Sequence, residues 1–483
     1  MLEAKQNLLK NSCDIVLERT VSKASEWEKS MKEKVLVAGC GISGIGALKL
    51  LLQVGESVIL YDGNDRLAED DVRRKAGVEQ PYELVLGPLT EEVLAQLKYC
   101  VISPGIPMDV PFVKQLQEAG IPIWSEIELA YQFGKGRIAA ITGTNGKTTT
   151  TALTGLIMEN WVGADKTHVV GNIGTPYTER VLQMTDDSIT VAEISSFQLE
   201  TILDFHPNVS AILNITPDHL NRHKTMDCYA QVKESITKNQ TADEAVILNY
   251  EDERLRAFGG QAPLKVVWFS SQRQLEQGFW MDGNTICYTH DGATEIIVTT
   301  DECNLVGQCN YENIMAACGI AVEMGVPMDI IRKSVREFRA VEHRIEYTVT
   351  KKGVKYYNDS KATNTDAAIQ GVKAMTTPTI LIGGGYDKGS EYDDWIATFG
   401  DKIKQLILIG ATSQKIADCA RKHGFTNLYF AETLEEAVRT AAANAVPGDA
   451  VLLSPACASW GMFDNYEQRG RIFKDLCRAL PEV

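Results

Sequence analysis

The residues with the clearest chemistry are Gly143 to Thr148, which read Gly-Thr-Asn-Gly-Lys-Thr. They follow an apolar run at 138–141 that is typical of a buried strand, and a helical pattern comes next. Glycines let backbone N–H groups close on phosphate oxygens, the Lys147 ammonium can reach terminal phosphates, and the Thr148 hydroxyl can bind Mg²⁺. A Gly/Thr-rich turn before an ordinary helix is the alternative. The strand–loop–helix order favours nucleotide binding, in a shortened loop because Ile141 replaces the usual first glycine.

A second glycine loop, Gly39-Cys-Gly-Ile-Ser-Gly44, lies nearer the N-terminus. A buried strand at 34–38 precedes it, a helix to Leu52 follows, and a second strand at 57–61 ends at Asp62. This is the dinucleotide-binding fingerprint of a βαβ unit. It predicts a phosphate or pyrophosphate at a helix N-terminus without choosing the ligand. The alternative is that these glycines only allow the helix and strands to pack closely.

Further polar residues follow strand ends, where ligands bind in open parallel sheets. Glu193 ends a predicted strand at 189–193, and a carboxylate there is well placed for Mg²⁺. His219 lies in a polar cluster after a strand at 209–215, and Lys233 lies on the next helix. A lone histidine is more often structural than functional, but this strand end delivers it towards the expected phosphate region.

The last third of the chain alternates strands and helices. A strand at 354–358 ends in Asp359-Ser-Lys-Ala-Thr-Asn364, and the final strand at 450–453 runs into Ser454. This alternation predicts a doubly wound open sheet with a site along one edge.

Composition bounds the remaining possibilities. A chain of 483 residues predicts roughly two to four domains. The net charge of −16 argues against a nucleic-acid partner, which would require clustered Lys and Arg. The 11 cysteines include no Cys-x-x-Cys pair, which suits free thiols in a reducing cytosol. No apolar run approaches the roughly 20 residues of a membrane span, and Lys5, Lys10 and Asp14 interrupt any signal peptide. We expect a cytoplasmic protein without membrane insertion.

Taken together, these motifs resemble the Mur ligases of peptidoglycan synthesis over roughly residues 34–483. The loop at 143–148 is shared across that family and with folylpolyglutamate synthases, which lack the first glycine loop. Three further stretches resemble the D-glutamate-adding members: His343-Arg344, Asn358 to Asn364, and Leu453 to Trp460. The Asp-Asn-Pro-Arg signature expected of diaminopimelate-adding members is missing.

The resemblance implies an α/β fold of three domains. These are a UDP-binding Rossmann-like domain at 34–125, a central P-loop ATPase-type domain with a mostly parallel sheet at 126–340, and a C-terminal Rossmann-like, amino-acid-binding domain at 341–483. Residues 1–33 form an N-terminal extension outside the pattern.

The resemblance also implies a carbon–nitrogen ligase that uses ATP and two Mg²⁺ ions. It adds D-glutamate to UDP-N-acetylmuramoyl-L-alanine through an acyl phosphate and releases ADP and phosphate. Such an enzyme serves cell-wall biogenesis, and so cell shape and division, and we expect it to be monomeric.

The family's functional residues can be carried over position by position. Catalytic roles fall on Lys147, His219, Lys233 and Lys361. ATP contacts fall on Gly143, Thr144, Asn145, Gly146, Lys147, Thr148, Thr149, Asn310, Arg344 and Asp359. Metal contacts fall on Thr148, Glu193, His219 and Lys233, with Lys233 carbamylated so that it offers oxygen. The UDP-muramoyl-alanine contacts are Ile42, Ser43, Asp62, Ser103, Pro104, Gly105, Asn172 and Ser195, and the D-glutamate contacts are His343, Lys361, Thr363, Ser454 and Phe463.

Some positions depart from the family pattern. Cys309 replaces a common His, Asn221 a frequent Asp, and Gly63-Asn64 a frequent Thr-Arg pair. Two other functions are compatible with parts of the sequence. A nicotinamide-dependent oxidoreductase would use the first glycine loop and Asp62 but leaves the 143–148 loop without a role. A nucleotide-gated binding protein would use both loops without ligation.

Overall fold

The computed structural model describes residues 33–172 and 174–482. The expected N-terminal extension lies outside these residues, except for residue 33. Contacts divide the described chain into two compact units. The first comprises 33–138, 168–207 and 219–239, and the second comprises 139–167, 208–218 and 240–482.

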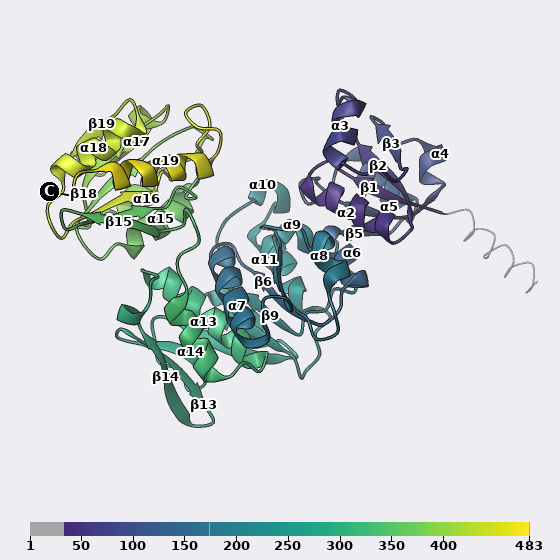
Figure 1. The fold of residues 1–483 in the computed structure, drawn as a ribbon, viewed down its shortest axis with the longest axis horizontal. Coiled ribbons are helices and arrows are strands. Elements are labelled where there is room, and N and C mark those ends of the chain that lie inside the picture. The colour runs from purple at the N-terminus through teal and green to yellow at the C-terminus, as the bar shows by residue number, and fades with distance from the viewer. Residues whose placement is uncertain (1–32, 173, 483) are drawn as a thin grey trace, which may run out of the picture. The chain divides into compact units, whose positions relative to one another are not determined.

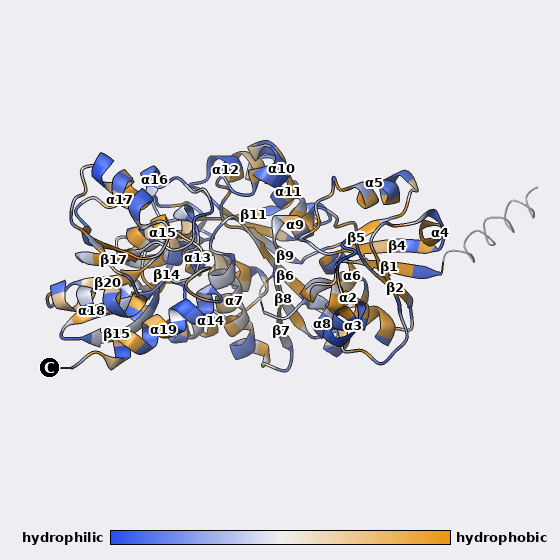
Figure 2. Cartoon of the chain, turned by 90° about the horizontal axis from the view of Figure 1, so that it is seen from above, coloured by the Kyte–Doolittle hydropathy of each residue, from blue (hydrophilic) through white to orange (hydrophobic). Residues whose placement is uncertain are grey.

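The first unit contains a parallel sheet of order β3-β2-β1-β4-β5 (Figure 1). Its strands are β1 (Lys34–Ala38), β2 (Ser57–Asp62), β3 (Glu83–Leu86), β4 (Leu97–Ile102) and β5 (Ile123–Ser125). Its helices are α2 (Ile42–Gln53), α3 (Glu69–Ala76), α4 (Glu91–Leu94), α5 (Pro111–Glu118) and α6 (Glu126–Phe133). Strands β1, β2 and β4 are hydrophobic along most of their length (Figure 2), as expected when helices cover both faces of a parallel sheet.

The rest of the first unit is built from shorter elements. They are β7 (Thr167–Gly171), α8 (Tyr177–Arg180), η1 (Val181–Gln183), β8 (Ile189–Glu193), α9 (Ser196–Leu199), α10 (Leu220–His223), α11 (Met226–Glu234) and η2 (Ser235–Thr237). Two buried carboxylates of α6 hold this part in place. Glu126 accepts hydrogen bonds from the backbone N–H and hydroxyl of Thr178, and Glu128 accepts from the N–H groups of Leu203 and Phe205. Both carboxylates are therefore satisfied although they are buried.

The second unit begins with the central sheet, whose strands there follow the order β14-β13-β12-β11-β10-β9-β6. Its strands are β6 (Arg137–Thr142), β9 (Val209–Ile212), β10 (Ala245–Asn249), β11 (Lys265–Ser270), β12 (Gly278–Asp282), β13 (Thr285–His290) and β14 (Ala293–Thr299). Its helices are α7 (Lys147–Val162), α12 (Glu253–Gly259), η3 (Thr300–Glu302), α13 (Gln308–Glu323) and α14 (Met328–Glu337). Pairing is parallel from β6 to β12 and antiparallel among β12, β13 and β14. The mostly parallel central sheet is thus confirmed.

The second unit also contains a C-terminal sheet of order β15-β16-β20-β17-β18-β19. Its strands are β15 (Glu346–Lys351), β16 (Val354–Asn358), β17 (Thr379–Gly383), β18 (Ile403–Leu408), β19 (Leu428–Phe430) and β20 (Ala450–Leu453). Its helices are α15 (Thr365–Ala374), α16 (Asp393–Ala397), α17 (Ser413–Lys422), α18 (Leu434–Asn444) and α19 (Tyr466–Ala479).

Alternate residues of the inner strands serve two separate cores in this sheet. Leu381, Leu406 and Leu452 pack with α15, α16 and α17. Ile382, Ile407 and Val451 pack with α18 and α19 on the opposite face. Because a strand's side chains alternate between faces, this pattern is that of a doubly wound sheet, as predicted.

The observed strands differ from the expected ones at a few places. Strands β3 and β5 were not predicted, because both are short and β3 is only half-buried. Strand β9 ends at Ile212 rather than Ile215, because the backbone beyond it turns towards the 143–148 loop. Among the described residues, the structure contains no helix with the length and apolar character needed to cross a membrane.

Candidate active site

The loop at 143–148 joins β6 to α7, as the sequence predicts. Gly146 caps α7 at φ +86°, a left-handed conformation that favours glycine. The loop is tied to the chain after β9, because the backbone N–H of Asn145 donates to Asn214 Oδ1 at 2.8 Å and the Thr144 hydroxyl bonds to the backbone of Thr216. The Lys147 ammonium donates to the carbonyl oxygens of Gly143 and Thr144 at 2.9 and 3.0 Å. Thr148 and Thr149 are buried in the first turn of α7.

A pocket in the second unit brings this loop together with residues from distant parts of the sequence. Of the predicted ATP residues it is lined by Asn145, Gly146, Asn310, Arg344 and Asp359, and it also contains Lys361. Asn310 is fixed in α13 because its amide donates to the Val306 carbonyl at 2.8 Å and accepts from Asn313. Asn313 in turn contacts Thr150 of α7, so α13 and α7 share one buried polar chain.

Asp359 follows β16 and is buried in the wall of this pocket. One carboxylate oxygen accepts from the Ser454 hydroxyl at 2.7 Å and the other from the backbone N–H of Ile345 at 3.2 Å. Burial raises the pKa of Asp359 to about 7, although the Ser454 hydrogen bond and the Arg344 charge both favour the carboxylate. The Nε atom of Arg344 is buried and has no hydrogen-bond partner among the described residues, so it can donate to a ligand.

The predicted D-glutamate residues do not all meet in this pocket. Lys361 lines it, whereas His343, Thr363, Ser454 and Phe463 do not. His343 is buried at φ +67°, its ring contacts the Asn358 amide at 2.9 Å, and its carbonyl accepts from the backbone N–H of Lys361. Burial lowers the pKa of His343 and so favours the neutral ring. In this structure His343 shapes the turn that carries Lys361.

The predicted metal residues other than Thr148 lie in the first unit. Glu193 ends β8 and is 2% exposed, and one of its oxygens accepts from the Asn172 amide at 3.0 Å. Its second oxygen, Oε2, is buried without a hydrogen-bond partner among the described residues. A buried carboxylate oxygen that accepts no hydrogen bond from the described residues suits a hard cation, so Glu193 fits the expected Mg²⁺.

His219 and Lys233 have different surroundings. His219 has φ +52°, which is unusual for a residue with a side chain, and its exposed ring lies 4.8 Å from the Phe197 ring. Lys233 is 1% exposed, with its ammonium 4.7 Å from the centre of the Tyr229 ring. Ser195, a predicted substrate residue, caps α9 through its hydroxyl and Gln198.

The first glycine loop leads from β1 into α2 as predicted. A Cβ atom at Gly44 would collide with the Gly39 carbonyl, so only glycine allows the loop to close this tightly. Ile42 is 71% exposed at the start of α2, with Ser43 beside it. Asp62 accepts hydrogen bonds from the backbone N–H groups of Cys40 and Asn64. Ser103, Pro104 and Gly105 form the turn after β4.

Sequence reasoning missed a cation beside this loop. The Lys75 ammonium, from the last turn of α3, donates to the Cys40 carbonyl at 2.9 Å. A lysine in the last turn of a surface helix is too common to be singled out from sequence. Sequence reasoning also missed Glu312 and Phe269, which line the pocket of the second unit.

Sequence reasoning also missed Arg222, which follows His219 in the first unit. Its guanidinium pairs with Glu200 and donates to the carbonyl oxygens of Pro104 and Ile106 at 2.6 and 2.9 Å. It also lies over the Phe197 ring, 4.1 Å from its centre. Arg222 thus connects the turn after β4 with the segment around His219.

Comparison with known proteins gives three family matches in chain order. Residues 33–125 match the Mur ligase MurD-like N-terminal domain, residues 141–321 the Mur ligase middle domain, and residues 343–457 the Mur ligase glutamate ligase domain.

Full-length relatives agree with these matches. The chain is 57% identical to UDP-N-acetylmuramoylalanine--D-glutamate ligase of Lachnospira eligens over 92% of this chain and 98% of the relative. It is 53% identical to the ligase of the same name in Lachnoclostridium phytofermentans over 93% and 99% of the two chains. The crystal structure of UDP-N-acetylmuramate-alanine ligase from Thermotoga maritima is similar in fold, with a TM-score of 0.57 and 16% identity over 92% of this chain and 99% of that one. The chain therefore belongs to the Mur ligase family.

Proposed function

We propose that this protein ligates D-glutamate to UDP-N-acetylmuramoyl-L-alanine and converts ATP to ADP and phosphate in the same reaction. The observation that carries the proposal is the 57% identity to a D-glutamate ligase over 98% of that relative. The pocket of the second unit supports it, because that pocket joins the phosphate loop to Asn310, Arg344 and Asp359. We propose the domain boundaries 34–125, 126–340 and 341–483, and the three family matches lie inside these ranges to within one residue.

ATP is proposed to bind with its triphosphate on the loop from Gly143 to Thr149. The Lys147 ammonium now donates to two loop carbonyls, and a phosphate oxygen is a stronger, charged acceptor that would compete for it. Asn310, Arg344 and Asp359 are proposed to contact the remainder of the nucleotide from the pocket wall. The buried Nε of Arg344 has no hydrogen-bond partner among the residues that the structure describes, which supports this role because a buried donor needs an acceptor.

Two Mg²⁺ ions are proposed to be held by Thr148, Glu193, His219 and a carbamylated Lys233. The cations would neutralise the negative charge that gathers where a carboxylate meets a triphosphate. Glu193 Oε2, which has no hydrogen-bond partner within the described part of the chain, supports Glu193 as one of these ligands. A lysine ammonium cannot bind a cation, so burial of Lys233 fits a metal role only if CO₂ converts it to a carbamate with oxygen donors.

UDP-muramoyl-alanine is proposed to bind at the first glycine loop and the neighbouring strand ends. Exposed Ile42 and the N-terminus of α2 at Ser43 suit the uridine and its diphosphate, and Asp62 anchors the loop. Ser103, Pro104, Gly105, Asn172 and Ser195 complete the proposed contacts. Lys75 is added to them, because its ammonium lies against the loop and can meet the diphosphate.

D-glutamate is proposed to bind near Lys361, with His343, Thr363, Ser454 and Phe463 around it. Its two carboxylates need cationic and hydroxyl partners. Lys361 lies in the pocket, which supports a direct contact. The buried hydrogen bonds of His343 and Ser454 support a positioning role for those two residues instead.

The proposed reaction has two chemical steps. The alanine carboxylate attacks the γ-phosphorus, and the bond to the β–γ bridging oxygen breaks, so that ADP leaves and an acyl phosphate forms. The glutamate amine then attacks the acyl carbon, phosphate leaves, and the amine releases a proton to solvent. The protein supplies position and positive charge, chiefly through Lys147 and Lys361. We propose that it works as a cytoplasmic monomer in cell-wall biogenesis, and so in cell shape and division.

Phosphate release tests this function. It should require ATP, UDP-muramoyl-alanine and D-glutamate together, and no release above background with all three present would refute the ligase. Fluorescence titration with NAD(P)H serves as the control, because tight binding that UDP does not compete with would favour an oxidoreductase. Release without D-glutamate would favour a nucleotide-gated binding protein.

The carbamate at Lys233 can be tested separately. Labelled bicarbonate should be incorporated into the wild type and not into Lys233→Ala, and short carboxylates should partly restore the variant's turnover. Equal label in both proteins would contradict the carbamate while leaving the ligase function intact.

A further inference from the structure

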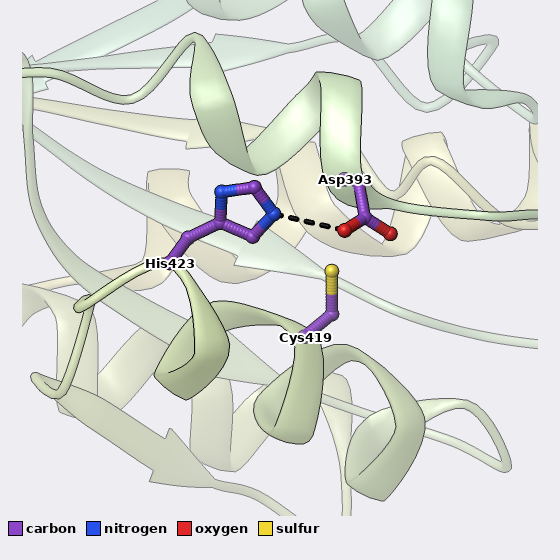
Figure 3. A group of neighbouring side chains, drawn as sticks. All are labelled: Asp393, Cys419 and His423. Carbon is purple, nitrogen blue, oxygen red and sulfur yellow. Dashed lines mark hydrogen bonds and ion pairs between the residues drawn. The ribbon is translucent and has the colours of Figure 1, made fainter.

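A second group of metal-binding side chains lies on the C-terminal sheet's helices. Cys419 and His423 are four residues apart at the end of α17, so they lie on one face of that helix. Asp393, the first residue of α16, faces them (Figure 3). Their ligand atoms all lie within 4.8 Å of one another, and the distance from His423 Nε2 to Asp393 Oδ1 is 2.9 Å. Among the described residues, no other His, Cys, Asp or Glu group meets this criterion.

The three donor atoms favour one class of metal ion. Thiolate and imidazole with one carboxylate suit a borderline-soft divalent ion such as Zn²⁺, whereas Mg²⁺ prefers oxygen alone. Three protein ligands leave a fourth tetrahedral position for water, the arrangement of open zinc sites. None of the three residues lines the pocket that contains Asn310 and Lys361, so this group is separate from the proposed ATP site.

The two helices hold the donors in place before any ion arrives. On α17, Ile416, Ala417 and Ala420 are buried in the same hydrophobic core as Trp395 and Ile396 of α16. Each donor therefore projects from a helix whose other face is anchored. Preorganised ligands lose less conformational entropy on binding, which favours affinity.

One neighbouring cation opposes metal binding. The Lys422 ammonium lies 2.7 Å from Asp393 Oδ1, the oxygen that also accepts from His423. A divalent ion between the three donors would replace the proton on His423 Nε2 and the thiol proton of Cys419. The imidazole would then carry its proton on Nδ1, and the thiol proton would pass to solvent. Lys422 would then repel the ion, so its charge should reduce the affinity without removing a ligand.

We propose that Asp393, Cys419 and His423 form a Zn²⁺ site, with Cys419 Sγ as thiolate, His423 Nε2 and one Asp393 carboxylate oxygen as ligands. The ion would link α16 to α17 at the surface of the C-terminal sheet. This proposal does not depend on the ligase function.

Cobalt titration of the full-length, chelator-treated protein tests the site. Co²⁺ should bind and give a thiolate-to-cobalt charge-transfer band, which Zn²⁺ should abolish by displacement. Co²⁺ at the proposed Mg²⁺ site would produce no such band, because none of the residues proposed there carries a thiol.

Variants test whether the charge-transfer band comes from Asp393, Cys419 and His423. Cys419→Ser should lose the band, and His423→Gln should weaken Co²⁺ binding at least about tenfold. Cys303→Ser, which alters a half-buried thiol elsewhere in the chain, is the matched control and should keep the band. Lys422→Met should tighten binding about fivefold, the effect of removing one like charge at a solvated site.

A second measurement protects against misfolded variants. Zn²⁺ should raise the thermal midpoint of the wild type and of Cys303→Ser but not that of Cys419→Ser. The proposal is overturned if wild type gives no charge-transfer band, or if the band survives Cys419→Ser unchanged.

Discussion

Replacing Arg222 removes the centre of a buried cluster in the first unit. The guanidinium makes three hydrogen bonds to Glu200, from Nε to Oε1 at 3.0 Å and to Oε2 at 3.2 Å, and from Nη2 to Oε2 at 2.5 Å. It also donates to the carbonyl oxygens of Pro104 and Ile106. The side chains of Arg222 and Glu200 are 12% and 13% exposed, so solvent screens the pair weakly.

The low exposure of this ion pair determines how much stability the variant should lose. Removing one partner of a buried ion pair leaves the other charged and unpaired, at a cost of about 3–5 kcal/mol. Arg222→Met should therefore destabilise the segment around α10 by that amount. Glu200→Gln should do the same, whereas the double variant should cost clearly less than the sum, because no uncompensated charge remains.

Native-state hydrogen exchange provides the assay. The backbone N–H groups of His223 and Lys224, which donate to the carbonyl oxygens of His219 and Leu220, should lose protection in each single variant. Because Arg222 also holds the Pro104 turn, KM for UDP-muramoyl-alanine should rise more than KM for ATP. Arg222→Lys should recover little, because an ammonium cannot reproduce the guanidinium's fork. Unchanged exchange and unchanged KM in Arg222→Met would refute this reasoning.

Three further predictions concern the other charged residues. Lys147→Ala should lower kcat by at least about 10³-fold, which is the scale of losing a preorganised cation. The surface variant Lys135→Ala is the control and should keep its kcat. Steady-state assays of both variants check this, and a similar kcat in the two would contradict it. Lys75→Ala should raise KM for UDP-muramoyl-alanine about tenfold with kcat little changed, with exposed Lys114→Ala as control, and an unaltered KM would remove Lys75 from the site. Burial raises the pKa of Asp359 from 3.8 to about 7. Between pH 3.8 and pH 7, the Asp359 carboxyl therefore carries a proton in the folded protein that it lacks in the unfolded chain. This group therefore favours folding increasingly as pH falls through 7, and Asp359→Asn should flatten the pH dependence of the free energy of unfolding in that window. An identical slope in both proteins would contradict the raised pKa.

Local patterns explain which parts of the fold were predictable. The loops at Gly39–Gly44 and Gly143–Thr148 each combine a buried strand, a glycine-dependent turn and a helix start within a short stretch. The strands β17 and β20 were also predictable, because both are continuous apolar runs. Alternate residues along each strand pack into two separate cores. These features depend on residues close in sequence, so periodicity reveals them.

Long-range contacts explain what sequence reasoning missed. The Arg222 cluster joins residues more than 100 positions apart, from Pro104 to Arg222, and no local pattern indicates that. Lys75 contacts the first glycine loop at Cys40, 35 positions away in the sequence. His343 was expected at D-glutamate from resemblance, whereas its buried hydrogen bonds to Asn358 emerge only in three dimensions.

ADP formation with a panel of amino acids probes the proposed ligation most directly. With ATP, Mg²⁺ and UDP-muramoyl-alanine present, D-glutamate should support turnover, and L-glutamate, L-lysine and diaminopimelate should leave the rate at background. Equal rates with any of those three, or no ADP with D-glutamate, would contradict the D-glutamate ligase.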